Sequence, residues 1–295
     1  MNIVIGIPAY NEENKIAGII TKLKKITDTI IVCNDGSSDL TGEIAAELGA
    51  IVINHEKNKG YGSAIRSIFL KARELKFDNL LTFDADGQHR IEDVKSVLKP
   101  IENEQADIVI GSRFLSKKSD EMPNYRKMGI KLITKVTNMS ITEKLTDSQS
   151  GFRAYNKKVL ENIIPTDEGM GVSTEILIKA SKLDFKIAEV PIKVNYKGKT
   201  STQDPVSHGT SVIISTLKFT SIHNPLKFYG IPGIIFLGIG LGFIAWTIQI
   251  YSTHQEVITN VSLIGIGCVV LGAVLLMTAV ILFSLVTLIN DTKGK

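Results

Sequence analysis

Two long stretches near the end of the sequence contain no charged residue. Residues 231–251 and residues 261–289 lack Asp, Glu, Lys and Arg throughout. Each stretch reaches the length of about 20 residues that a helix needs to cross the hydrocarbon core of a bilayer. The alternative is a hairpin buried inside a soluble core, but uncharged runs of this length argue against it. The sequence therefore predicts an integral membrane protein with two transmembrane helices.

The charges around these two stretches predict their orientation. The linker between them, residues 252–260, contains one acidic residue and no Lys or Arg. The outer flanks carry the basic residues, which are Lys218, Lys227, Lys293 and Lys295. Because cytoplasmic flanks are enriched in Lys and Arg, we expect both termini and the N-terminal domain in the cytoplasm.

The chain divides into three parts by composition. Residues 1–207 are expected to form an α/β domain, and residues 229–295 form the transmembrane hairpin. Between them, residues 208–228 alternate apolar residues with lysine and histidine, a pattern that favours an amphipathic segment at the membrane surface. Gly238 and Gly242 have the spacing by which transmembrane helices pair, which is compatible with a homo-oligomer. The net charge of +4 makes nucleic acid an unsuitable partner.

The first half of the chain alternates short β-like runs with helical patterns. Between the first two strands, apolar residues recur at helical spacing from Ile16 to Ile26, and Asn11 is placed to cap this helix. Such alternation predicts an α/β fold with a mostly parallel, doubly wound sheet. The expected strands are residues 2–7, 29–34, 50–54, 79–83 and 108–111, and the further helices are residues 41–48, 61–75 and 91–101.

Polar residues follow four of these expected strands at the point where each strand ends. The segments are PAYNEE from Pro8, DGSSD from Asp35, DADGQH from Asp84, and the single residue Arg113. Doubly wound sheets bind ligands at the carboxyl ends of their strands, near a switch in strand order. The sequence therefore predicts one binding site at this edge of the sheet.

Asp84 and Asp86 are separated by one residue, so both carboxylates can reach the same cleft, with the Gln88 carbonyl nearby. Oxygen ligands without His or Cys suit Mg²⁺ or Mn²⁺. Such an ion would neutralise the charge that develops on a diphosphate leaving group. Solvated turn residues are the alternative, but the preceding apolar strand and the other strand-end clusters favour a metal site.

Asp35 follows the second strand, where the base or ribose of a nucleotide lies in a doubly wound sheet. An Asp-Gly turn is the alternative reading of this position, and Asp39 is expected to cap the next helix. Pro8, Tyr10 and Glu12 are candidates for the other side of the nucleotide pocket.

Basic residues beyond the acidic pair are candidates for binding the phosphate of an acceptor. Arg113 is favoured because guanidinium groups make bidentate contacts to phosphate, with Arg126, Lys127 and Lys131 as further candidates. The two lysines are equally compatible with a solvated helix face. A phosphate with a second pKa of about 6 is already ionised near neutrality, so it needs positioning more than a strong base. Asp147 could orient the acceptor, act as a base, or form a turn.

These residues resemble the dolichol-phosphate mannose synthase branch of the family-2 glycosyltransferases. The segments PAYNEE, NDGSSDLT, DADGQH, GSRF, DSQSGFRAY and TEILIKA occur in the family's order, over roughly residues 1–200. The resemblance implies a GT-A (Rossmann-like) fold. It also implies a metal-dependent, inverting transfer from GDP-mannose or a related donor to dolichyl or another polyprenyl phosphate.

The resemblance also assigns site residues. Asp84, Asp86 and Gln88 would hold the metal, while Arg113 and a basic residue near Arg126 would meet the lipid phosphate. The other assignments by motif are Pro8, Tyr10, Glu12 and Asp35 for the nucleotide and Lys199 for the donor phosphates.

The chain departs from the family's pattern at three places. Asn34 replaces the first aspartate of the usual Asp-Asp-Gly, and Ile130 and Lys131 stand where a serine often follows the acceptor arginine. The loop KGKTSTQDPVSHG lacks the common arginine. UDP-glucose and UDP-N-acetylhexosamine therefore stay open as donors.

Three other functions compete with this interpretation. A processive polysaccharide synthase carries a QxxRW motif, whereas Gln149 to Arg153 has the wrong spacing and no Trp follows. A sugar nucleotidyltransferase needs a glycine-rich phosphate loop after the first strand, which PAYNEE is not. A non-catalytic nucleotide-sugar-binding membrane protein would not need the intact pair Asp84 and Asp86.

Overall fold

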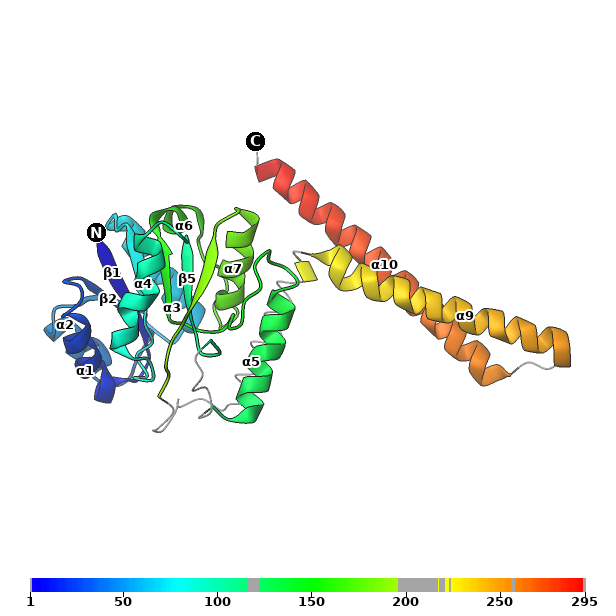
Figure 1. Cartoon of the computed structure of the whole chain (residues 1–295), viewed down its shortest axis with the longest axis horizontal. Coiled ribbons are helices and arrows are strands. Elements are labelled where there is room, and N and C mark those ends of the chain that lie inside the picture. Colours follow the sequence, from blue (N-terminus) through cyan, green and yellow to red (C-terminus); the bar gives the residue numbers. More distant parts are fainter. Residues whose placement is uncertain are drawn as a thin grey trace. The chain divides into compact units, whose positions relative to one another are not determined.

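The computed structural model describes residues 2–115, 122–195, 217, 221–222, 224–255 and 258–293. The chain forms two compact units, Met1–Thr216 and Leu217–Lys295 (Figure 1). The predicted surface segment 208–228 and Lys199 lie largely or wholly outside the described residues.

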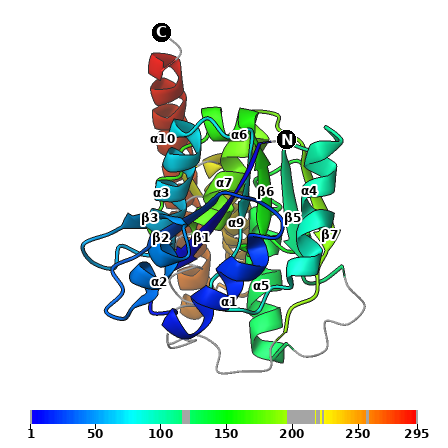
Figure 2. The ribbon, with the colours of Figure 1, turned by 90° about the vertical axis from the view of Figure 1, so that its left-hand side faces the viewer.

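The first unit is built on a seven-stranded sheet with the order β3-β2-β1-β4-β6-β5-β7. In Figure 2 the sheet runs from β3 on the left to β7 on the right. β6 runs antiparallel to both of its neighbours, and the other pairings are parallel. All five predicted strands are present, with ends within two residues of the predicted ones, while β6 and β7 were not predicted. The strands are β1 (Ile3–Ala9), β2 (Ile30–Asn34), β3 (Ile51–Asn54), β4 (Asn79–Thr82), β5 (Ile108–Ser112), β6 (Arg153–Asn156) and β7 (Ile187–Pro191).

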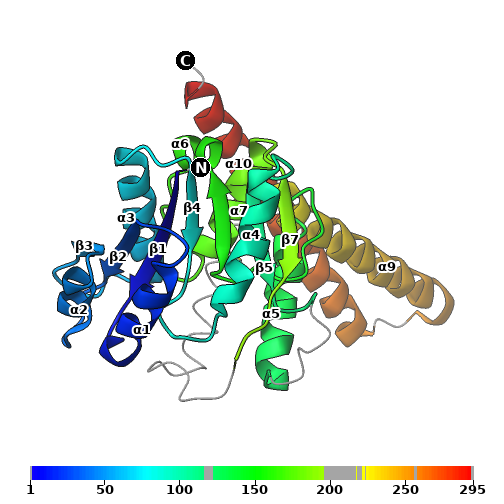
Figure 3. The ribbon, with the colours of Figure 1, turned by 60° about the vertical axis from the view of Figure 1, so that its left-hand side comes forward.

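Helices cover both faces of the sheet and bury its side chains in two apolar clusters. On one face α1 (Glu13–Leu23), α2 (Thr41–Glu47) and α4 (Val94–Glu102) pack, with α1 and α4 in front of the sheet in Figure 3. On the other face lie α3 (Tyr61–Glu74), α6 (Lys157–Asn162) and α7 (Val172–Lys182). The short helix η1 (Ile91–Asp93) precedes α4, and α5 (Asn124–Thr137) follows β5. This three-layer arrangement confirms the predicted α/β class.

The strand order reverses at the centre of the sheet. From β1 the chain moves outward through β2 to β3, and then returns to place β4 on the other side of β1. The connections after β1 and β4 therefore diverge, which opens a crevice at their carboxyl ends. Pro8 and Ala9 at the end of β1, and the acidic pair after β4, lie at this switch point.

The predicted cap of α1 was wrong. Asn11 adopts a left-handed backbone conformation with φ of 54°, and its side-chain oxygen accepts from the Ser38 amide at 2.9 Å instead of a helical amide. Asp39 instead binds amides at helix starts, because its two oxygens accept from the Glu13 amide and the Thr41 amide. One carboxylate thus satisfies exposed N–H groups at the starts of both α1 and α2.

The second unit is a helical hairpin. A short helix, η3 (Leu226–Gly230), leads into α9 (Ile231–His254) and α10 (Thr259–Lys293). Both are long and apolar enough to cross a membrane, and only 11% of the most apolar window of each is buried within the protein. These helices contain the two uncharged stretches identified in the sequence.

Four glycines lie at the contact between α9 and α10. A Cβ atom on Gly240 would lie 2.8 Å from the Gly265 carbonyl oxygen, and one on Gly272 would lie 2.8 Å from the Gly233 carbonyl oxygen. The backbones approach this closely only because these residues lack side chains. Gly242, in contrast, has no neighbouring atom within 4 Å of a Cβ and lies outside this contact. The predicted oligomer contact through Gly238 and Gly242 stays a prediction.

We expect Gly240→Leu to separate the two helices, because a leucine side chain cannot fit against Val269 and Gly265. Gly242→Leu is the matched control, since open space surrounds that position on the same helix. Thermal unfolding of both purified variants in detergent, followed by circular dichroism, should show a lower melting temperature for Gly240→Leu only. Equal melting temperatures would contradict the glycine contact.

Candidate active site

A cleft of about 460 Å³ opens at the carboxyl edge of the sheet, and it gathers most of the residues predicted from the sequence. Those that line it are Pro8, Tyr10, Glu12, Asp35, Asp84, Asp86, Gln88, Arg113 and Arg126. These residues come from the carboxyl ends of four strands, from the loops that follow them and from α5, so the fold brings together side chains far apart in the sequence.

The acidic pair lies at the base of the cleft. Asp84 accepts from the Tyr61 hydroxyl at 3.1 Å and pairs with His89 Nε2 at 3.0 Å. Burial alone would raise the pKa of Asp84, but the hydrogen bonds and charge of His89 hold that pKa below its usual value. For Asp86, burial and the neighbouring Asp84 charge raise the pKa above its usual value. Two carboxylates therefore share one partly desolvated site.

This arrangement suits a divalent cation. A cation between Asp84 and Asp86 would relieve the repulsion that raises the Asp86 pKa, and Gln88 adds an amide oxygen on the same wall. Among the described residues, no three His, Cys, Asp or Glu side chains are grouped as a complete metal site. A cation held here would therefore need ligand or water oxygens as well, as hard divalent ions commonly do.

Asp35 is held firmly at the end of β2. Its carboxylate accepts from the amides of Lys59 and Gly60 at 2.9 and 2.8 Å, and from His55 Nδ1 at 2.6 Å. The opposite ring nitrogen of His55 lies 2.9 Å from the Ser67 hydroxyl. These contacts attach the end of β2 to the start of α3 and fix the Asp35 carboxylate on the cleft wall.

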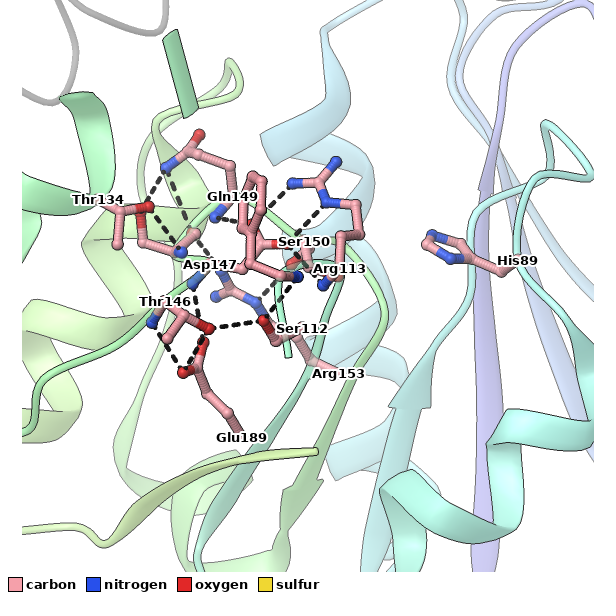
Figure 4. Close-up of polar contacts among 12 residues, drawn as sticks. His89, Ser112, Arg113, Thr134, Thr146, Asp147, Gln149, Ser150, Arg153 and Glu189 are labelled. Atoms are coloured by element: carbon pink, nitrogen blue, oxygen red, sulfur yellow. Dashed lines mark hydrogen bonds and ion pairs between the residues drawn. The ribbon is translucent and has the colours of Figure 1, made fainter. Parts of the chain in front are cut away.

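Arg113 and Asp147 form a buried ion pair, shown in Figure 4. Arg113 Nε and Nη2 donate to the two Asp147 oxygens at 2.7 Å each, and the Arg113 amide adds a third bond at 3.1 Å. Burial would raise the pKa of Asp147, but the Arg113 charge holds it below its usual value. Asp147 is fully buried and does not line the cleft.

This geometry argues against Asp147 as a base, one of the roles considered from the sequence. Both of its oxygens are occupied by Arg113, and the ionised form is the one that the pair stabilises. Asp147 is placed to orient Arg113, whose side chain does reach the cleft.

The floor of the cleft is the loop before β6. Arg153 is fully buried and donates to the carbonyl oxygens of Ser148, Ser150 and Ser173 at 2.6, 2.7 and 2.9 Å. A Cβ on Gly151 would lie 2.5 Å from the Tyr61 hydroxyl and 2.7 Å from Asp84 Oδ2. Asp84 therefore packs directly against Gly151, where any larger residue would displace the Asp84 or Tyr61 side chain.

One wall of the cleft is a face of α5. Tyr125, Gly129, Ile130 and Ile133 line it, with Arg126 as the charged residue on this face. The other two predicted phosphate ligands on this helix, Lys127 and Lys131, do not line the cleft. Lys131 is exposed, and its ammonium lies 5.9 Å from the centre of the Phe114 ring. The wall is therefore largely apolar.

The structure adds residues that the sequence reasoning missed. His89 lies three residues after Asp86 in DADGQH, so its position was a signal that could have been used. Tyr61 and Gln149 also line the cleft. Glu189 on β7 does not line it but accepts a hydrogen bond from the Thr146 amide, next to Asp147. For Tyr61 and Glu189, no local sequence pattern marks a role, because each meets its partner only through the fold.

Comparisons with known proteins agree with this geometry. A family model described as Glycosyl transferase family 2 matches residues 4–164. The chain is 37% identical over 233 residues to a UDP-N-acetylglucosamine–dolichyl-phosphate N-acetylglucosaminyltransferase of Methanococcus voltae, covering 72% of this chain and 91% of that protein. It is 32% identical to a dolichyl-phosphate hexose transferase of Haloferax volcanii, covering 73% and 92%.

Among solved structures, the chain resembles glucosyl-3-phosphoglycerate synthase from Mycobacterium tuberculosis, crystallised with Mn²⁺, UDP and glucosyl-3-phosphoglycerate. The TM-score is 0.58 at 20% identity, covering 74% of this chain and 79% of that one. This similarity confirms the expected GT-A fold.

We expect Asp147→Asn to destabilise the protein by about 3–5 kcal/mol, because it leaves the buried Arg113 charge without its partner. The lowered pKa of Asp147 means that the ion pair contributes fully above about pH 4, the ordinary aspartate pKa, and less as the pH falls further. Thermal unfolding of wild type and variant should therefore differ most near neutrality and converge in acid. A pH-independent difference would contradict this electrostatic origin.

Proposed function

This chain belongs to glycosyl transferase family 2, and we propose that it transfers a hexose from a nucleotide sugar to a polyprenyl phosphate such as dolichyl phosphate. Both relatives described above are named as dolichyl-phosphate transferases, and this chain covers more than nine-tenths of each. Their names differ in the sugar. GDP-mannose, the donor favoured from the sequence, therefore competes with UDP-N-acetylglucosamine and UDP-glucose.

The observation that carries this proposal is the chemical contrast between the two ends of one cleft. One end holds the carboxylates Asp35, Asp84 and Asp86, and the α5 wall presents Tyr125 and Ile133 among apolar neighbours. A small, water-soluble acceptor acid would gain little binding free energy from contact with an apolar wall. An isoprenoid chain would bury its first units there, at about 25 cal/mol for each Å² of apolar surface removed from water.

The acidic end is suited to a nucleotide sugar. Asp35 would contact the nucleoside, and Pro8, Tyr10 and Glu12 would form the opposite side of its pocket. Asp84, Asp86 and Gln88 would hold Mg²⁺ or Mn²⁺, which would offset the charge that grows on the departing diphosphate. Lys199, outside the described residues, is proposed from the sequence resemblance to contact the donor phosphates.

The acceptor phosphate would be bound by Arg113 and Arg126. Arg113 is preorganised by Asp147, so its position needs no adjustment on binding. An ionised phosphate oxygen attacks the anomeric carbon as the bond to the nucleoside diphosphate breaks, which inverts the configuration. No general base is required, which agrees with the burial of Asp147.

The two apolar helices would anchor the enzyme in the bilayer that supplies its acceptor. We extend the proposal to the orientation expected from the flanking lysines, with the catalytic unit and both termini in the cytoplasm. A homo-oligomer is part of the same proposal and follows only from the Gly238 and Gly242 spacing.

A transfer assay tests the proposal directly. Purified chain in detergent, with Mn²⁺ and a polyprenyl phosphate, is given labelled GDP-mannose, UDP-glucose or UDP-N-acetylglucosamine in separate reactions. We expect lipid-linked sugar with one of them, and its loss with EDTA or in Asp86→Ala, because the cation is then lost or poorly held. Transfer unchanged in Asp86→Ala would contradict the metal assignment. No lipid product with any donor would contradict the function.

Gly129 offers a test of the acceptor wall. It stands in the middle of α5, where glycine is about 1 kcal/mol less favourable than alanine, yet no atom lies within 4 Å of a Cβ placed there. We expect Gly129→Leu to fill the space beside the wall and raise the KM for polyprenyl phosphate about tenfold. The KM for the donor should stay within about twofold.

Gly18, an exposed glycine within α1 that also has open space around it, is the matched control for Gly129. Gly18→Leu should leave both KM values unchanged. An unchanged acceptor KM in Gly129→Leu would show that the acceptor does not pass this wall.

A further inference from the structure

The turn that carries Asp147 is held by a second carboxylate, that of Glu189. One oxygen of Glu189 accepts from the Thr146 amide at 2.7 Å and from the Thr146 hydroxyl at 2.9 Å. The other oxygen accepts from the Asp147 amide at 2.8 Å. Figure 4 shows these contacts between β7 and the turn. Three donors thus converge on one side chain that does not line the cleft.

The same turn is fixed from its other side by β5. The Thr146 hydroxyl lies 2.7 Å from the Ser112 hydroxyl, and the next residue, Arg113, makes its three bonds to Asp147. The contacts on both sides of the turn hold the Asp147 carboxylate against Arg113. Any shift of the turn changes the direction of the guanidinium that enters the cleft.

An ionised carboxylate at position 189 is disfavoured by its surroundings. Burial and the nearby Asp147 charge raise the pKa of Glu189 above its usual value, despite the hydrogen bonds that favour its ionised form. Glutamine would be nearly isosteric, but its NH₂ group would face an amide donor and leave a buried N–H without an acceptor. Only a side chain with two accepting oxygens satisfies all three donors.

We propose that Glu189 is a positioning residue for acceptor binding, which it controls by fixing the Thr146–Asp147 turn and through it Arg113. This inference rests on the proposed function, since it assumes that Arg113 meets the acceptor phosphate. Glu189 contacts no substrate and acts only through the ion pair.

The protein contains a matched control for this arrangement. Glu175 on α7 holds another Thr-Asp pair in the same way, accepting from the Thr166 amide and hydroxyl and from the Asp167 amide. That loop packs on the start of α3, where the Glu168 carbonyl accepts from the Gly62 amide at 2.9 Å. Glu175 thus holds a Thr-Asp pair through the same three donors as Glu189, and it also pairs with Lys179 at 2.6 Å. The loop that it holds does not carry Asp147.

The experiment compares Glu189→Gln with Glu175→Gln in the full-length chain purified in detergent. We expect Glu189→Gln to raise the KM for polyprenyl phosphate about tenfold, with the donor KM within about twofold of wild type. Glu175→Gln should leave the acceptor KM within twofold. Glu189→Asp keeps both accepting oxygens and should give an intermediate acceptor KM. Equal effects of both Gln variants on the acceptor would overturn the proposal.

A double-mutant cycle separates positioning from general damage. If Glu189 acts through Arg113, then Glu189→Gln should cause no further loss of acceptor binding in an Arg113→Ala background. A full additional loss would overturn the inference. Calorimetric titration with farnesyl phosphate, without donor, gives the same comparison independently of turnover.

The binding measurement also distinguishes the two proposals. If wild type binds farnesyl phosphate in a Glu189-dependent manner but transfers no sugar to any polyprenyl phosphate, the function fails and the positioning role stands. If wild type is active and Glu189→Gln binds farnesyl phosphate normally, the positioning role fails alone. If wild type neither binds farnesyl phosphate nor transfers sugar to any polyprenyl phosphate, both are overturned.

Discussion

The described part of the active site depends on a guanidinium that solvent does not reach. Arg153 occupies the start of β6 and donates to three carbonyl oxygens, two in the preceding loop and one in the first turn of α7. A buried charge is tolerated only when its hydrogen bonds are made, so the loop keeps its shape while Arg153 is in place. The Thr82 hydroxyl attaches the same loop to β4 through the Gly151 carbonyl at 2.7 Å. The loop that packs against Asp84 is therefore hydrogen-bonded to both β4 and α7.

The acidic side chains and the basic side chain of the site lie at the ends of different strands. Asp84 and Asp86 follow β4, while Arg113 follows β5 and is already paired with Asp147. The antiparallel strand β6 lies between β4 and β5 and carries the floor loop at its start. A donor diphosphate with its cation and an acceptor phosphate would otherwise repel one another. Fixed groups of opposite sign at the two places reduce the reorganisation that their approach requires.

The sequence by itself determined the family, the α/β class, the five parallel strands and the two apolar helices. These features are local. Strand runs, helical periodicity and uncharged stretches are properties of consecutive residues, and parallel topology sends every strand-end cluster to one edge of the sheet. For that reason the nine predicted residues from Pro8 to Arg126 could be gathered into one cleft without knowledge of any contact.

Only the tertiary structure decided the partners of those residues. The Arg113–Asp147 pair joins positions 34 residues apart, and Glu189 reaches Thr146 across 43 residues. Asn11 looked like a helix cap, yet it bonds to Ser38, 27 residues away. Periodicity carries no information about such pairings, because which polar groups meet depends on strand order. The antiparallel insertion of β6 is what gave Asp147 a buried place behind Arg113 and set the floor beneath the acidic pair.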